Sequence, residues 1–96
     1  MYARVTRAQT APENLDAAIE RVRRHYLPAI RDEGGKGYLV LVDRASGKAM
    51  TVAVYETEDA LRRSVLAAQA RAATATTPLT APREEEIYEV IEDARF

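Results

Sequence analysis

Cysteine and tryptophan are absent from this 96-residue sequence, and histidine occurs only once. Without cysteine the chain has no disulfide, no thiolate nucleophile and no thiolate ligand for a metal, which fits a reducing cytoplasm. A metal site would depend on carboxylates around that one histidine, and no spacing in the sequence favours such a site. We therefore predict that the protein uses no metal and no cofactor.

Neither sign of charge dominates the chain. Fourteen Lys and Arg residues against fifteen Asp and Glu residues give a net charge of −1, so we expect no nucleic-acid partner. No apolar run approaches the roughly 20 residues that a membrane helix needs, and the first residues form an alternating strand pattern instead of an apolar signal core. We expect a cytoplasmic protein without a membrane partner, folded as a single domain over residues 1–96.

The most informative stretch is residues 37–57, which reads as two apolar strands joined by a polar loop at residues 44–47. Pairing Asp43 with Lys48 divides the side chains between two faces. The bulkier, wholly aliphatic face is predicted to lie under helices, and it carries Leu39, Leu41, Met50, Val52 and Val54. The other face is mixed yet still too apolar for water, and it carries Tyr38, Val40, Val42, Ala49, Thr51, Ala53 and Tyr55. A face that the chain cannot cover itself predicts a homodimer.

The remaining elements complete a β-α-β-β-α-β order. A strand over residues 2–7 precedes a helix that starts near Thr10, is disturbed at Pro28 and ends at Gly34. A second helix follows the hairpin with Thr57 as its N-cap, and a loop over 74–83 leads to a last strand near 86–92. This order predicts an α+β, ferredoxin-like fold with a four-stranded antiparallel sheet and both helices on one face.

Four segments carry a resemblance to a known family: M-Y-A-R-V-T, L-V-D-R-A-S-G-K, V-Y-E-T-E-D-A and I-Y-E-V. Across nearly its whole length the chain resembles the antibiotic-biosynthesis-monooxygenase-like proteins of the dimeric α+β barrel superfamily. That resemblance implies a homodimer with two sheets face to face, and a pocket between helices and sheet. Its characterised members include cofactor-independent oxygenases of polycyclic aromatic substrates and haem-degrading enzymes. The chain departs from them in that Tyr55 stands where many members have Trp, and the second helix has no His, so no catalytic residue carries over.

Candidate residues for a site and for an interface follow from these patterns. His25 is the weak catalytic candidate, since a base near neutral pH could remove a phenolic proton, although an exposed helix histidine is the favoured interpretation. The candidates for lining a ligand pocket are Val5, Tyr26, Leu41 and Tyr55. The candidates for the dimer interface are Arg4, Thr6, Tyr38, Val40, Val42, Thr51 and Ala53.

Two functional hypotheses remain open at this point. In one, the protein is a small cofactor-independent monooxygenase that acts on, or binds, a flat apolar or aromatic small molecule. In the alternative, it is a non-catalytic homodimeric module that binds a small ligand or serves assembly. An open cavity that reaches His25 or Tyr26 would favour the first hypothesis, and a solid core would favour the second.

Overall fold

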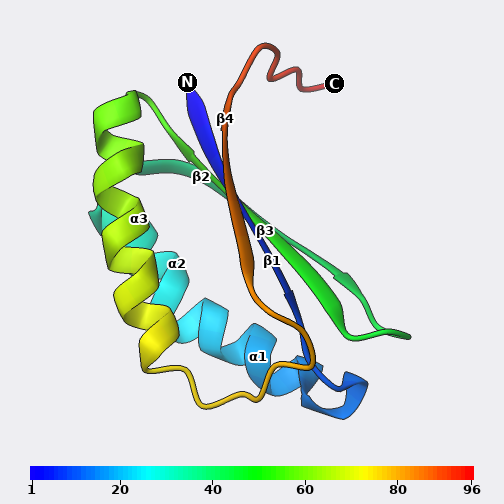
Figure 1. Ribbon diagram of the computed structural model, residues 1–96. Helices are drawn as coiled ribbons and strands as arrows, with labels where there is room; N and C mark the ends of the chain where they lie inside the picture. Colours follow the sequence, from blue (N-terminus) through cyan, green and yellow to red (C-terminus); the bar gives the residue numbers. More distant parts are fainter.

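The computed structural model describes residues 1–96 as one antiparallel sheet with helices on one side (Figure 1). The elements in chain order are β1 (Tyr2–Gln9), a 3-10 turn η1 (Pro12–Asn14), α1 (Leu15–Arg21), a π-helical turn η2 (Val22–Tyr26), α2 (Leu27–Asp32), β2 (Gly35–Asp43), β3 (Lys48–Tyr55), α3 (Glu58–Ala73) and β4 (Glu84–Glu89). The strand order is β2-β3-β1-β4, with every neighbouring pair antiparallel. The predicted ferredoxin-like α+β fold is confirmed. None of the helices combines the length and the hydropathy that a membrane-spanning helix needs.

The hairpin has the predicted register, with Asp43 opposite Lys48 and Leu39 opposite Val52. Gly47 closes the loop at a φ of +78°, a conformation that favours glycine. Its amide donates to the Asp43 carbonyl at 2.9 Å, and its carbonyl accepts from the Thr10 amide at 3.0 Å. The loop is therefore tied to the end of β1 as well as to its own strands.

The first helical segment is interrupted near Pro28, as the sequence predicted. Pro28 lies in the first turn of α2, directly after the π-helical turn η2. A proline has no amide to donate to the preceding turn, and a π-turn is one of the ways a helix absorbs such a gap. The second helix begins as expected, because the Thr57 hydroxyl accepts from the Ala60 amide at 3.1 Å.

The two faces of the sheet are assigned in the opposite sense to the prediction. The mixed face lies under the helices, where Ala53 and Tyr55 pack with Ile30 and Leu61. The aliphatic face carries no helix (Figure 1). Leu39 and Leu41 are 56% and 49% exposed on it. A narrow, alanine-rich α3 can approach the sheet closely only where the strands present small residues, which the mixed face supplies.

This reversal corrects the placement of most candidate residues. The candidates for the interface lie on the helix-covered face instead. The strand register and the alternation of side chains place all of them on the side of the sheet where Arg4, Thr6 and Ala53 are buried: Arg4, Thr6, Tyr38, Val40, Val42, Thr51 and Ala53. Two candidates for the pocket, Val5 and Leu41, lie on the open face instead. Neither residue lines the cavity between the sheet and the helices, and Leu41 lines a hollow on the open face.

Tyr55 carries a buried hydroxyl group without a hydrogen-bond partner, while its ring is fully enclosed in the core. Tyr55→Phe is expected to raise the free energy of unfolding by about 1 kcal/mol, because it removes an unsatisfied polar atom from the interior. Urea unfolding measures this as a higher midpoint with an unchanged slope. Tyr26→Phe is the matched control, since it deletes a hydroxyl that accepts from Arg21 Nε at 3.2 Å and should lower the midpoint. A lower midpoint for Tyr55→Phe would show that the hydroxyl has a stabilising partner.

Candidate ligand cavity between the helices and the sheet

A cavity of about 180 Å³ lies between the helix-covered face of the sheet and the helices. Strand side chains form one wall, α1, η2, α2 and α3 supply the opposite wall, and the loop before β4 adds its rim. Twelve of its twenty lining residues are hydrophobic. An apolar cavity of roughly 150 Å³ is enough to hold benzene, so this space matches one aromatic ring with a small substituent.

Small residues on the facing elements create this space. Ala68 and Ala72 of α3 face Ala49 and Thr51 of β3 across the cavity. Larger side chains at these positions would fill the gap between helix and sheet. The cavity is therefore a product of the alanine-rich helix face that the sequence displays.

Tyr26 forms an aromatic wall that is flanked by two guanidinium groups. The Arg21 and Arg71 guanidinium carbons lie 5.8 and 5.7 Å from the centre of its ring. Arg21 also donates from Nε to the Tyr26 hydroxyl at 3.2 Å and from Nη2 to the Thr74 carbonyl at 3.0 Å. Cations over the ring and a donor on its hydroxyl both fix Tyr26, so it is a positioned aromatic side chain in the cavity wall.

Arg4 brings a charge into the interior from the middle of β1. Its side chain is 4% exposed, and its Nε donates to the Ser64 hydroxyl at 3.3 Å. Its Nη1 lies 3.7 Å from Glu85 Oε2, whereas its buried Nη2 has no hydrogen-bond partner. Ser64 is itself held, because it donates to the Leu61 carbonyl at 2.5 Å. Arg4 is thus oriented from one side and left with a free donor.

Tyr38 contributes a second hydroxyl from β2. Burial raises the pKa of Tyr38 above its ordinary value, and the nearby Thr51 hydroxyl together with the Arg4 and Arg71 charges only partly offsets this. A phenol with a raised pKa keeps its proton at neutral pH. Tyr38 is therefore a hydrogen-bond donor in the cavity and is unsuited to act as a general base.

The structure brings only part of the predicted site together. Tyr26 lines the cavity, and so do three of the residues that were assigned to the interface: Arg4, Tyr38 and Thr51. Tyr55 is buried behind the lining, and His25 is exposed on η2 away from it. His25 therefore has no contact with the cavity through which it could act as a base there.

Sequence reasoning missed three arginines that line the cavity, namely Arg21, Arg71 and Arg83. Arg21 stands close in sequence to Arg23 and Arg24, and such a cluster of charge is typical of a solvated helix face. Arg71 follows Ala68 by three residues and so borders the alanine face of α3, which is a signal that the sequence does contain. Arg83 belongs to the loop before β4, where no periodicity indicates the direction of a side chain.

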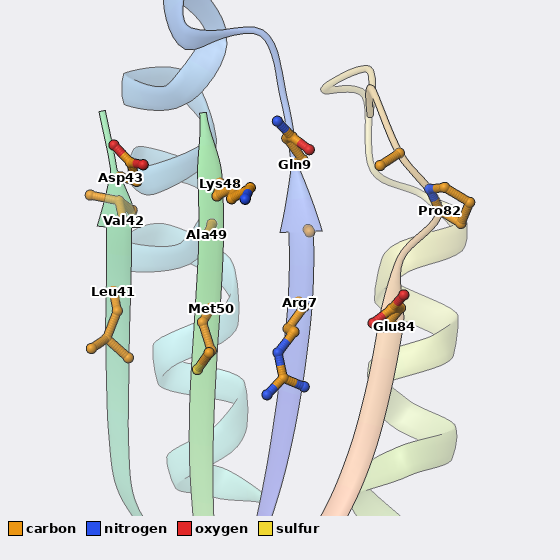
Figure 2. A pocket seen from close by; sticks show the side chains of 12 residues that line it. Arg7, Gln9, Leu41, Val42, Asp43, Lys48, Ala49, Met50, Pro82 and Glu84 are labelled. Atoms are coloured by element: carbon orange, nitrogen blue, oxygen red, sulfur yellow. The ribbon is translucent and has the colours of Figure 1, made fainter. Parts of the chain in front are cut away.

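A second hollow lies at one end of the open sheet face and has a volume of about 590 Å³. Figure 2 shows Leu41, Met50, Arg7 and Glu84 in one row across β2, β3, β1 and β4, with the helices behind the sheet. This hollow is a broad groove on the surface, lined by six hydrophobic residues among twelve. No cluster of three or more His, Cys, Asp or Glu side chains that could hold a metal ion exists in the structure.

Comparison with curated sequences finds relatives of unknown activity. The uncharacterised protein Rv2558 of Mycobacterium tuberculosis is 38% identical over 66 residues, which is 68% of this chain and 28% of that protein. A second protein of the same species, Rv2557, is 37% identical over 65 residues, or 67% of this chain and 29% of its own length. The chain thus matches less than a third of the length of these relatives. No family model matches the sequence.

Comparison with solved structures identifies the fold. A protein of Nitrosomonas europaea, provisionally named an antibiotic biosynthesis monooxygenase, has a TM-score of 0.74 at 19% identity, covering 96% of this chain and 100% of that one. A monooxygenase of Streptomyces coelicolor bound to nanaomycin D has a TM-score of 0.75 at 17% identity, covering 98% and 90%. A dimeric ferredoxin-like protein from an uncultured marine organism has a TM-score of 0.72 at 9% identity, covering 97% of each chain. The resemblance predicted from the sequence is confirmed at the level of this shared fold.

Proposed function

We propose that this protein is a homodimeric, monooxygenase-like protein that binds a flat, single-ring aromatic molecule in the cavity between the helices and the sheet. The observation that carries the proposal is the cavity itself, which has room for one ring beside the fixed aromatic side chain of Tyr26. A filled core would have favoured a purely structural module. The ligand-bound monooxygenase of the same fold supports the choice of an aromatic molecule.

Phenol oxidation is the reaction that this arrangement suits. When O2 converts a phenol to a quinone, one oxygen atom enters the ring and the other leaves as water, so the reaction needs no external reductant. The protein's share would be to bury and orient the ring and to favour its ionised form through nearby guanidinium groups. No histidine or carboxylate lines the cavity as a base, which is the specific observation that favours binding without catalysis as the second candidate.

The open face of the sheet supports the homodimer. Its aliphatic side chains on β2 and β3 carry no helix, and Tyr88 adds a ring that is 46% exposed on β4, at the other edge of the same face. Beyond β4 the chain continues past the sheet (Figure 1). Ile91 is 79% exposed and Phe96 is fully exposed in this segment. Uncovered apolar surface of this kind marks an interface, and a second copy of the same face can pack against it under twofold symmetry. The dimeric ferredoxin-like neighbour supports this arrangement.

Binding of benzyl alcohol, measured by calorimetry, tests the proposed cavity. Ala72→Leu is expected to lower the affinity about tenfold or more, because the added carbons occupy the volume that the ring needs. Ala70→Leu adds the same group at an exposed position of α3 and should leave the affinity unchanged. Equal affinities for both variants, or no binding by the wild type to any single-ring probe, would contradict the proposal. Oxygen uptake with phenols then separates a monooxygenase from a binding protein.

A further inference from the structure

The lining of the cavity carries an excess of positive charge. Four arginines contribute to it and no Asp or Glu does. Only two carboxylates form ion pairs with these arginines. Glu85 is shared, because its Oε2 lies 3.0 Å from Arg83 Nη2 and 3.7 Å from Arg4 Nη1. Glu33 pairs with Arg71 at 2.7 Å.

Arg21 has no carboxylate partner, since its bonds go to the Tyr26 hydroxyl and to Thr74. Two guanidinium charges are therefore uncompensated around one small, largely apolar space. Uncompensated charge of one sign in a partly closed space raises the local potential and attracts a counter-ion. The ligand-free cavity is electrostatically suited to an anion.

Arg4 identifies where that anion would bind. A buried guanidinium nitrogen without a partner costs free energy, and native proteins rarely leave such a group unsatisfied without a functional reason. The Ser64 contact at Nε and the Glu85 contact at Nη1 fix the plane of the group. Nη2 then remains as a preoriented donor in a residue that lines the cavity.

Two residues with hydroxyl groups share the cavity lining with Arg4 on the sheet side. Tyr38 and Thr51 line the same cavity, and the Arg4 charge acts on Tyr38 closely enough to influence its ionisation. Tyr38 keeps its proton and can donate to a second oxygen of an anionic group. A guanidinium together with a phenol makes a pair of donors that matches a carboxylate.

We infer that the cavity selects an aromatic carboxylate, with the ring beside Tyr26 and the carboxylate on the guanidinium group of Arg4. This inference rests on the proposed function, because it names the class of ligand for the same cavity. No acid or base step is required of the protein for binding. One negatively charged group would satisfy the orphan donor and halve the charge excess.

Comparing benzoate with benzyl alcohol tests the inference, because the two probes share ring and size and differ in charge. Calorimetry at neutral pH is expected to show that the wild type binds benzoate about tenfold or more tightly than benzyl alcohol. Arg4→Met should bring the ratio of the two affinities close to one, and this ratio is independent of any loss of affinity that both probes share. Arg4→Lys, which keeps the charge and loses the forked donor geometry, should restore the preference for benzoate in part.

Two further variants complete the design. Arg21→Met removes a lining charge without orphaning a carboxylate and should weaken benzoate binding selectively, which keeps the test decisive if Arg4→Met fails to fold. Arg63→Met removes an exposed arginine of α3 outside the lining and should change neither affinity. Equal wild-type affinities for the two probes would overturn the inference and leave the proposed cavity intact. Absence of binding by both probes would overturn the proposed function as well.

Discussion

Replacing Leu39 with aspartate is expected to reduce the mass of the protein in solution from twice 10.7 kDa to the mass of one chain. Leu39 is 56% exposed on the open sheet face, which in the proposed homodimer packs against its symmetry copy. Burying a carboxylate there without a partner costs several kcal/mol, and each interface would contain two of them. We expect the dimer dissociation constant to rise at least about a hundredfold. Light scattering over a range of concentrations measures it.

Val40→Asp is the matched control for this result. Val40 is the next residue on β2, 39% exposed, and its side chain points to the helix side of the sheet. The Val40→Asp protein should therefore remain dimeric. If Val40→Asp dissociates the dimer and Leu39→Asp does not, the interface would lie on the helix side of the sheet and the proposed assembly would be wrong.

The substitution Gly47→Ala is expected to lower the free energy of unfolding by about 3 kcal/mol or more. Gly47 has a φ of +78°, and a Cβ atom there would overlap the Thr10 carbonyl oxygen. Neither atom can yield cheaply, because the Gly47 carbonyl also accepts from the Thr10 amide and holds the loop against the end of β1. Urea unfolding should show a strongly lowered midpoint.

Gly34→Ala separates the clash from the backbone strain. Gly34 has a φ of +94°, but nothing lies within 4 Å of the position its Cβ would take. Its substitution should cost only about 1 kcal/mol, the conformational penalty alone. Equal losses for the two variants would mean that the contact between the hairpin loop and β1 does not constrain the fold.

The fold and the register could be predicted because local signals agree with the final structure. Asp43 and Gly47 fix the length of the loop, and the loop length fixes which residues pair. Pro28 and Thr57 mark a helix disturbance and a helix start, and both are seen. These features depend on residues close in sequence, where backbone geometry and capping decide the outcome.

The choice of face could not be predicted, since hydrophobicity alone did not distinguish the two sides of the hairpin. Leu39 and Leu41 form the more apolar side, yet that side is open in the structure. The helix side accepts Arg4 and Thr6 because Ser64 and Glu85 supply partners from distant segments. Such partners lie 60 or more residues away in sequence, and no periodicity reveals them.

The candidate site could be predicted only in part, because its residues were assigned from the wrong choice of sheet face. Tyr26 was predicted for the pocket from the apolar face of its helix, and it lines the cavity. Arg4 was predicted to lie at the interface as a consequence of the reversed faces, whereas it lines the cavity. Arg71 and Arg83 approach the cavity only through the path of α3 and of the loop that follows it.

Chemical-shift mapping of the labelled protein with benzyl alcohol tests the central claim, that the helix side of the sheet holds the ligand site. We expect shifts only for methyl groups that line the cavity, such as those of Ala18, Thr51 and Ala68. Leu39 and Leu41 on the open face should show none, because the proposed partner subunit covers them. Shifts centred on Leu39 and Leu41, with the cavity methyl groups unchanged, would contradict both the site and the assembly.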